Sequence, residues 1–228
     1  MKIYLTRHSK TLWNQEKRLQ GWQDSPLTAE GIEDAKLLKA RITELKIDYC
    51  YSSPIERAKA TSEILFDHVL VDERLKEMNF GKYEGCLINE LLNDPIYNRL
   101  WNLPDDDVST PGGETYHEVQ MRLKDFFNDI YKKHHDDTIF ITIHGMLFII
   151  LHGIMLNYKT SELTKINKYV VRGCSLSEVE YDGKEFKVKY IGDDDYCELA
   201  KSLINHVSVY GEELSYKESI LNDAIKCL

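Results

Sequence analysis

The sequence contains no CxxC pair, and its few cysteines are odd in number and scattered. The five are Cys50, Cys86, Cys174, Cys197 and Cys227. Disulfide frameworks use even numbers of cysteines at short spacings, and structural zinc sites use closely paired cysteines. The pattern therefore argues against both kinds of protein, and we expect reduced thiols in a cytoplasmic protein.

Basic residues are also scarce. The chain has 29 Lys and Arg against 38 Asp and Glu, which gives a formal net charge of −9. Nucleic acids and anionic membranes both attract basic surfaces, so neither is expected as the main partner. If the ligand is a phosphate, a local cluster of cations has to attract it against the overall charge of the protein.

Long apolar runs are absent, with one exception. No signal peptide is expected, because Arg7 interrupts the N-terminal apolar run. Residues 138–156 are apolar over about the length of a bilayer core, but they include His144 and His152. A buried parallel strand followed by a buried helix has the same apolar density. We interpret the segment as part of the core.

The sequence is otherwise that of a soluble globular protein, with 43% apolar and 29% charged residues over 228 positions. Short apolar runs predict strands at residues 2–5, 48–51, 69–71 and 139–143. Helical periodicity predicts helices after Thr28, Ser53 and Thr115, with Thr28 as an N-cap. The alternation implies right-handed crossovers. We expect an α/β fold, a three-layer α/β/α sandwich with a mainly parallel central sheet.

The C-terminal part follows another pattern. Segments 176–181 and 184–191 flank Asp182-Gly183, a preferred two-residue hairpin turn. Two amphipathic helices are expected after three consecutive aspartates. We therefore expect an α/β domain over residues 1–192, followed by a helical extension over 193–228 that packs on or beside it.

The helix after Ser53 is expected to start at Pro54, with Ser53 as its N-cap and Arg57 in its first turn. A cation there faces the positive end of the helix dipole, at a cost of a few tenths of a kcal/mol. A bound anion would reverse that sign. The alternative is a solvated arginine whose long stem carries the charge away from the helix.

Three predicted strand ends carry residues that handle anions. Arg7-His8 follows the first strand, Arg57 the second, and His144 the strand at 139–143. In a parallel sheet these ends share the edge at which α/β folds bind ligands. A guanidinium holds an anion by a planar fork of donors, and a neighbouring imidazole can attack it.

Each of these residues has an ordinary alternative explanation. His144 taken alone is explained by a buried histidine bonded to the backbone. His8 taken alone fits a metal ligand, but no further ligands stand at zinc-like spacing. Residues 134–137 (His-His-Asp-Asp) are adjacent and do not converge on one face, so we expect a solvated turn there.

Taken together, the motifs resemble the histidine phosphatase superfamily, which has the phosphoglycerate-mutase-like fold. They occur in the family's order across residues 1–192 and are specific as a set. The matching segments are Arg7-His8 with Thr11, Trp13, Asn14 and Gly21; Leu27–Gly31; Ser52–Thr61; Leu75–Glu77 with Phe80-Gly81; Pro111–Glu114; and His144-Gly145.

The resemblance implies a phosphoric monoester hydrolase in which His8 is the nucleophile and forms a phosphohistidine. Attack requires a neutral imidazole, and neighbouring Arg7 and Arg57 disfavour its protonated form. Its second nitrogen is expected to donate to a backbone carbonyl. Arg7, Arg57 and His144 would hold the equatorial phosphoryl oxygens.

The remaining implied residues complete the site. Glu77 matches the family's acid, which protonates the leaving alcohol and then activates water. Taken alone, Glu77 would be a surface carboxylate in an acid-rich turn. Asn14, Gln20 and Gly21 are expected in the phosphate-binding set. Because cations take the place that magnesium has in other phosphoryl-transfer enzymes, we expect no metal and no other cofactor.

The motif departs from the family pattern after the nucleophile. The family usually has Gly or Ala and then often Glu at these positions, whereas this chain has Ser9 and Lys10. Ser9 is expected to tighten or reshape the phosphate pocket, since it has a side chain where Gly has none. Lys10 is expected to add a positive charge near it.

Three functions fit these residues: a phosphomonoesterase, a phosphoglycerate-type mutase, and a non-catalytic phosphate-binding relative. A mutase needs extra cations over its site, but residues 86–111 hold five acids and one base, Arg99. We therefore favour a small-molecule phosphomonoester with a neutral, apolar or cationic organic part. Trp13, Tyr97 and Trp101 are candidates for stacking or core packing. The natural substrate stays open, as does the oligomeric state, with a homodimer as one option.

Overall fold

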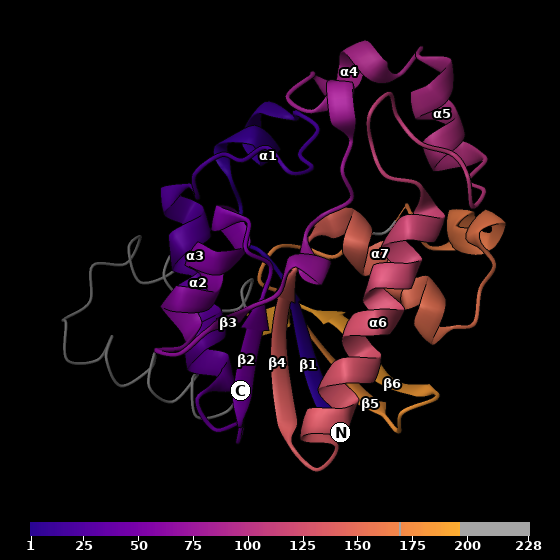
Figure 1. Cartoon of the computed structure of the whole chain (residues 1–228). Coiled ribbons are helices and arrows are strands. Elements are labelled where there is room, and N and C mark those ends of the chain that lie inside the picture. Colours follow the sequence, from indigo (N-terminus) through magenta and orange to yellow (C-terminus); the bar gives the residue numbers. More distant parts are fainter. Residues whose placement is uncertain (169, 197–228) are drawn as a thin grey trace.

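A six-stranded sheet is the middle layer of the computed structural model, which describes residues 1–168 and 170–196. Its order is β3-β2-β4-β1-β5-β6 (Figure 1). The strands are β1 (Lys2–Arg7), β2 (Tyr49–Ser52), β3 (Leu70–Val71), β4 (Thr138–Ile143), β5 (Leu176–Tyr181) and β6 (Phe186–Asp193). The first four run parallel, and β5 is antiparallel to β1 and β6. The predicted mainly parallel sheet and the predicted hairpin are confirmed.

Helices cover both faces of the sheet. The α-helices are α1 (Leu12–Glu16), α2 (Ala29–Ile42), α3 (Glu56–Leu65), α4 (Ile88–Leu91), α5 (Pro95–Asn102), α6 (Tyr116–His134) and α7 (Gly145–Met155). Three short 3-10 helices are η1 (Glu73–Leu75), η2 (Gly81–Tyr83) and η3 (Thr160–Lys165). Helices α2 and α3 lie on one face, and α6 and α7 on the other (Figure 1). This is the predicted three-layer α/β/α sandwich.

The alternation of side chains along β1 divides the core in two. Ile3 and Leu5 pack with the residues of α6 and α7, whereas Tyr4 between them packs with Ala35 and Leu38 of α2. Both faces of the strand are therefore buried, as expected for a central strand of a parallel sheet. Residues 138–156 form β4 and the buried helix α7, which confirms their assignment to the core. Across the described residues, no helix has both the length and the apolarity to cross a bilayer.

The starts of α2 and α3 were both predicted from a capping residue, with different outcomes. The hydroxyl of Thr28 accepts a hydrogen bond from the Gly31 backbone N–H at 3.0 Å, which confirms Thr28 as the N-cap of α2. The predicted start of α3 is wrong. The helix begins at Glu56 with Ile55 at its N-cap, and the Ser53 hydroxyl instead accepts from the Ile55 N–H.

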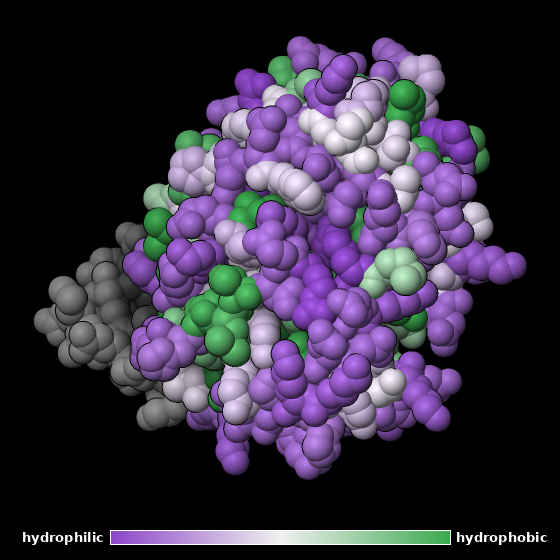
Figure 2. Space-filling view, viewed as in Figure 1, coloured by the Kyte–Doolittle hydropathy of each residue, from purple (hydrophilic) through white to green (hydrophobic). Residues whose placement is uncertain are grey.

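The segment before α6 contains two short helices. The second begins separately because Asp94 caps it and Pro95 stands in its first turn. Together with α1, helices α4 and α5 lie beyond the carboxyl ends of β1 and β4 (Figure 1). The face in this view is mostly hydrophilic, with apolar residues in small separate groups (Figure 2).

Two further predictions concern chain ends and turns. The turn predicted at residues 134–137 is not fully solvated: His134 ends α6, only 10% of its side chain is exposed, and its ring lies 2.9 Å from both Tyr51 Oη and Asp137 Oδ2. Strand β6 extends to Asp193, one residue beyond the predicted boundary of the α/β domain. Beyond Tyr196, the predicted helical extension lies outside the described residues.

Candidate active site

The parallel register of the sheet brings the predicted histidines together. Arg7 at the end of β1 pairs with Ile143 at the end of β4, so His8 and His144 leave the sheet side by side. Their ring centroids are 5.2 Å apart. Strand β2 pairs with β4 on the other side, and the chain after it brings Arg57 to the same edge.

His8 is held as a neutral imidazole with a defined tautomer. It is 3% exposed, and its Nδ1 lies 2.8 Å from the Ser9 carbonyl, to which it can only donate. Its Nε2 accepts from Arg57 Nε at 3.3 Å and therefore carries the lone pair. Burial, followed by the charges of Arg57 and Arg7, lowers the pKa of His8 well below its ordinary value. The expected bond to a backbone carbonyl is present.

Arg57 is fully buried and bonded to a loop of the chain ahead of α2. Besides His8, its guanidinium donates to the carbonyls of Gly21 at 2.7 Å and Gln23 at 3.0 Å, and to Asp24 Oδ1 at 3.1 Å. The other Asp24 oxygen accepts the Arg57 backbone N–H at 3.0 Å. The carboxylate of Asp24 therefore lies at the N-terminus of α3 and offsets the unfavourable position of the Arg57 charge there.

Several buried nitrogen atoms beside His8 lack a hydrogen-bond partner among the described residues. They are Arg7 Nε, which is a donor, and both ring nitrogens of His144, one of which is a donor in the neutral ring. The Arg7 Nη1 atom donates to the Val171 carbonyl at 3.1 Å, and Gly145 lies against the same guanidinium. Burial, followed by the charge of Arg57, lowers the pKa of His144 well below its ordinary value. Unpaired buried donors are costly, and a bound oxyanion would satisfy them.

Glu77 is a buried carboxyl at the N-terminus of α7, not a surface acid. Its Oε1 accepts from the Met78 and Leu147 backbone N–H groups at 2.9 and 2.8 Å, and its Oε2 accepts from that of Met146 at 3.0 Å. These bonds and Arg57 favour the carboxylate, but burial outweighs them and raises the pKa of Glu77. The group is therefore suited to exchange a proton with a bound substrate.

The three remaining predicted residues lie at the rim of the site. Asn14 Nδ2 donates to Gln20 Oε1 at 3.2 Å, and Gln20 donates in turn to Ser25 Oγ at 2.8 Å. Gln20 therefore orients Asn14, whose second amide hydrogen is left for a ligand. Gly21 contributes its carbonyl to Arg57, and a Cβ at this position would overlap the side chain of Glu84.

The two unusual residues after His8 both bond to residues of α2. The Ser9 hydroxyl donates to the Gly31 carbonyl at 2.6 Å, so it anchors the loop on α2 and does not enter the pocket. Lys10 pairs with Glu30 at 2.7 Å. Lys10 lines a cavity of about 220 Å³ that shares Arg7, His8 and Asn14 with the main site, which places it beside the phosphate pocket as expected. Ser9 lines neither this cavity nor the one that contains Glu77, and its effect on the shape of the pocket stays a prediction.

The main cavity, of about 230 Å³, contains His8 and Glu77 and extends toward residues 86–111, which we call the cover of the site. Its walls beyond the phosphate-handling groups are mainly apolar: Leu19, Phe80, Ile88, Trp101, Met146 and Val170. None of the five acids counted in the cover lines it, and a cation, Arg18, does. Arg18 donates to Glu16 at 2.6 Å and to the Gly85 carbonyl at 2.8 Å. Of the three candidate stacking residues, only Trp101 lies in the wall of this cavity.

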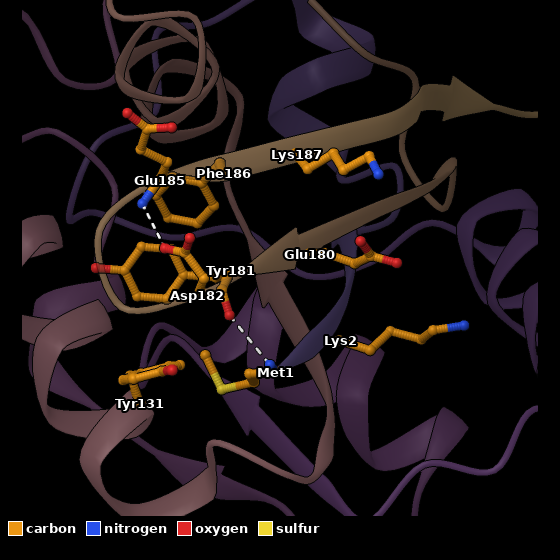
Figure 3. Close-up of a pocket in the computed structure, with 9 residues that line it drawn as sticks. All are labelled: Met1, Lys2, Tyr131, Glu180, Tyr181, Asp182, Glu185, Phe186 and Lys187. Atoms are coloured by element: carbon orange, nitrogen blue, oxygen red, sulfur yellow. Dashed lines mark hydrogen bonds between the residues drawn. The ribbon is translucent and has the colours of Figure 1, made fainter.

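A larger cavity, of about 750 Å³, lies at the β5–β6 hairpin beside the N-terminus. Figure 3 shows Tyr181 and Phe186 stacked in its wall, and the Met1 amino group bonded to the Tyr181 carbonyl. It contains none of the predicted site residues, and Asp182 is occupied in capping the turn. Size alone therefore does not locate the chemistry.

Sequence reasoning missed two carboxylates that shape the site. Asp24 holds Arg57, and Glu84 accepts the backbone N–H groups of Trp22 at 2.9 Å, Gln23 at 2.6 Å and Phe80 at 3.0 Å. Both act between segments far apart in sequence, and no local pattern marks either. Within residues 1–168 and 170–196, no group of three His, Cys, Asp or Glu side chains is placed to hold a metal ion.

Comparisons with known proteins agree with this geometry. The solved structure of Bacillus stearothermophilus YhfR is 33% identical, superimposes with a TM-score of 0.78, and is matched over 86% of this chain and 98% of that one. A Hydrogenobacter thermophilus protein named "Putative phosphoserine phosphatase 2" is 29% identical over 197 residues, 83% of this chain and 94% of its own. A protein of Enterobacter sp. (strain 638), named "Probable phosphoglycerate mutase GpmB", is 28% identical over 191 residues, 79% of this chain and 85% of its own.

A family model described as "Histidine phosphatase superfamily (branch 1)" matches residues 3–194, nearly the whole described chain. The match confirms the predicted family and fold class and, at the level of the family, the enzyme class. The Arg7-His8 motif, the Arg57 segment, Glu77 and His144 all lie inside the matched range. The chain belongs to the histidine phosphatase superfamily, branch 1.

Proposed function

We propose that the protein is a metal-independent phosphatase that hydrolyses a small phosphomonoester through a phosphohistidine on His8. The observation that carries this proposal is the state of His8. Its Nε2 lone pair is unprotonated and faces a cluster of buried cationic and neutral donors, several of them unpartnered. A neutral nucleophile surrounded by anion-binding groups is the arrangement that phosphoryl transfer requires.

In the first step His8 Nε2 attacks the phosphorus atom, a nitrogen–phosphorus bond forms, and the bond to the leaving oxygen breaks. The oxygens of the phosphoryl group would accept from Arg7, Asn14, Arg57 and His144. The Arg57 Nε–H, which now donates to the His8 lone pair, would turn to a phosphoryl oxygen, a stronger acceptor because it is charged. Glu77, in its protonated form, gives its proton to the leaving oxygen.

In the second step the carboxylate of Glu77 takes a proton from water, and the water oxygen attacks the phosphorus of the phosphohistidine. The nitrogen–phosphorus bond breaks, and its electron pair returns to His8 Nε2. Inorganic phosphate leaves, and Glu77 is protonated again. One water is consumed for each ester hydrolysed, and no redox partner or metal is needed.

The wall of the main cavity supports a monoester with an uncharged organic part. Six apolar side chains line it beyond the phosphate-handling groups, so burying an apolar leaving group there is favourable. The support comes from these walls and not from the acids of the cover, which lie outside the cavity. We also propose a cytoplasmic location, since Cys50, Cys86 and Cys174 are free thiols.

A phosphoglycerate-type mutase is the second candidate, and Arg18 is the observation that favours it. A mutase holds a second anionic group, and Arg18 is a cation in the cavity wall. Its charge already has Glu16 as a partner, and its side chain is about a third exposed. An ion pair between Arg18 and a second phosphate would likewise be partly exposed. Exposed ion pairs contribute about 0–1 kcal/mol, which is too little for Arg18 alone to hold a second phosphate.

Hydrolysis of an aryl phosphate is expected to proceed without added metal and to be unaffected by EDTA. The reason is that the phosphate cradle consists of protein donors: Arg7, Asn14, Arg57 and His144. Rapid quenching with labelled substrate should leave phosphate on His8, in a form that is labile to acid and stable to base. The His8→Ala variant should retain no label. Loss of activity with EDTA that zinc or magnesium restores would contradict the mechanism, and so would label on another residue.

The Glu77→Gln variant is expected to lose about 10²–10⁴-fold in kcat/KM for alkyl phosphates, which need a proton on the leaving oxygen. The ratio kcat/KM reports the first step, so loss of the base in the second step does not enter it. The variant should lose far less for dinitrophenyl phosphate, whose leaving group departs as a stable anion. Because burial raises the pKa of Glu77, wild-type kcat/KM on alkyl phosphates should fall as pH rises through that pKa. The variant should lack this fall. An equal loss with both leaving groups would show that Glu77 positions the substrate and transfers no proton.

Singly phosphorylated substrates are expected to be preferred over bisphosphorylated ones, because the main cavity offers one partly neutralised cation beyond the phosphate cradle. The measurement compares kcat/KM for phenyl or sugar phosphates with that for a bisphosphoglycerate at low ionic strength, in the wild type and in Arg18→Ala. Arg18→Ala should leave the aryl phosphatase rate unchanged. If the bisphosphate is preferred, or phosphoglycerates interconvert faster than they are hydrolysed, the mutase is the correct assignment.

A further inference from the structure

Arg122, on α6, donates three hydrogen bonds to the backbone of the segment that carries Glu77. Its Nη1 donates to the carbonyls of Arg74 and Lys76, both at 2.7 Å, and its Nη2 to the carbonyl of Glu77 itself at 3.0 Å. Two further donors reach Glu114 at 2.9 and 3.1 Å. All five guanidinium N–H groups are therefore used, and three of them donate to backbone carbonyls within residues 74–77.

The segment needs such support because it has no regular structure of its own. Residues 76–80 lie between η1 and η2, so neither a helix nor a sheet ladder fixes the backbone around Glu77. Glu114, the partner of Arg122, accepts the Asn79 backbone N–H at 2.8 Å, on the far side of Glu77. The Arg122–Glu114 pair thus holds the chain both before and after the acid.

Neither Arg122 nor Glu114 lines the main cavity or the smaller cavity beside it. The charge of Arg122 is one of the weaker causes that lower the pKa of His144, after burial and Arg57. The side chains of Arg122 and Glu114 are 15% and 17% exposed. The Glu77 carboxyl points the opposite way, onto the N-terminus of α7 and toward the arginines of the cradle. The hydrogen bonds of Arg122 to the Glu77 segment therefore all go to backbone carbonyls, and none goes to the Glu77 carboxyl.

We propose that Arg122 is a positioning residue for the acid: by fixing the carbonyls of Lys76 and Glu77 it keeps the Glu77 carboxyl within reach of the leaving oxygen. This inference rests on the proposed function, in which Glu77 transfers the proton. It places the effect of Arg122 on proton transfer and not on phosphate binding. A displacement of about 1 Å at a reacting group costs on the order of 100-fold in rate, so loss of this support has a measurable consequence.

The chain offers a matched control in Arg74. This residue lies on η1, within the same segment, and ties it to α6 through Asp125 at 2.6 Å and Asp129 at 2.8 Å. None of its side-chain bonds goes to a carbonyl next to Glu77. Arg122→Lys and Arg74→Lys therefore remove the same planar fork from the same interface, one with and one without contact to the acid's backbone.

The experiment measures kcat/KM, which reports the first step, for a primary alkyl phosphate and for dinitrophenyl phosphate in wild type, Arg122→Lys and Arg74→Lys. Arg122→Lys should lose about tenfold or more on the alkyl phosphate and less than about threefold on dinitrophenyl phosphate. Arg74→Lys should leave the ratio of the two rates unchanged. In a Glu77→Gln background, Arg122→Lys should add no further loss on the alkyl phosphate, because the proton transfer it supports is already absent.

Equal losses with the two leaving groups would overturn the proposal, and so would full additivity with Glu77→Gln.

The carbon-13 titration of the Glu77 carboxyl gives a readout that needs no turnover. In Arg122→Lys the pKa of Glu77 should move toward its ordinary value, whereas in Arg74→Lys it should not; an unchanged titration in Arg122→Lys also overturns the proposal. If the wild type hydrolyses neither ester, the proposed function fails, and the titration still decides the part concerning Arg122. Glu114→Gln, which retains the Arg122 carbonyl bonds, should shift both readouts in the same direction by less.

Discussion

The site depends on burying a neutral imidazole among cations that are not fully neutralised. Arg7 and Arg57 both lie within reach of His8, and Asp24 is the carboxylate bonded to Arg57 on the side away from the pocket. Burial and like charge together keep His8 unprotonated, and they also make a protonated His144 unfavourable. What remains is an excess of donors without acceptors, and a phosphate dianion supplies both the acceptors and the charge.

The rest of the fold keeps these groups in place. Parallel pairing of β1 with β4 fixes the positions of His8 and His144. Strand β2 pairs with β4 on the other side, and the chain after β2 brings in Arg57. The less regular parts are held by side chains that cross between segments. Glu84 ties the Gly21–Asp24 loop, which binds Arg57, to the segment after Glu77. The Trp22 indole N–H donates to the Glu77 carbonyl at 2.9 Å, so the anion cradle and the acid share one framework.

Features determined by neighbouring residues were predicted correctly from the sequence, whereas features determined by contacts between distant segments were not. Strands such as 139–143 and helix caps such as Thr28 are determined by residues adjacent in the chain, and they were located correctly. The start of α3 was wrong because its anion, Asp24, comes from 33 residues earlier and leaves no local signal. The acids of residues 86–111 were read as a charged cover, but Asp94 caps α5 and Asp105 pairs with Arg99, away from the cavity. Local pattern shows which residues are charged, and only the fold shows which way they face.

The titration of His8 tests the central claim most directly. Nitrogen-15 NMR of the histidine side chains, with His8→Asn for assignment, reports both its protonation and its tautomer. The account predicts a neutral ring with the proton on Nδ1 that persists well below about pH 6.5, the ordinary histidine pKa. A His8 that titrates near or above that value, or that carries its proton on Nε2, would contradict it, because Nε2 would then have no lone pair with which to attack phosphorus.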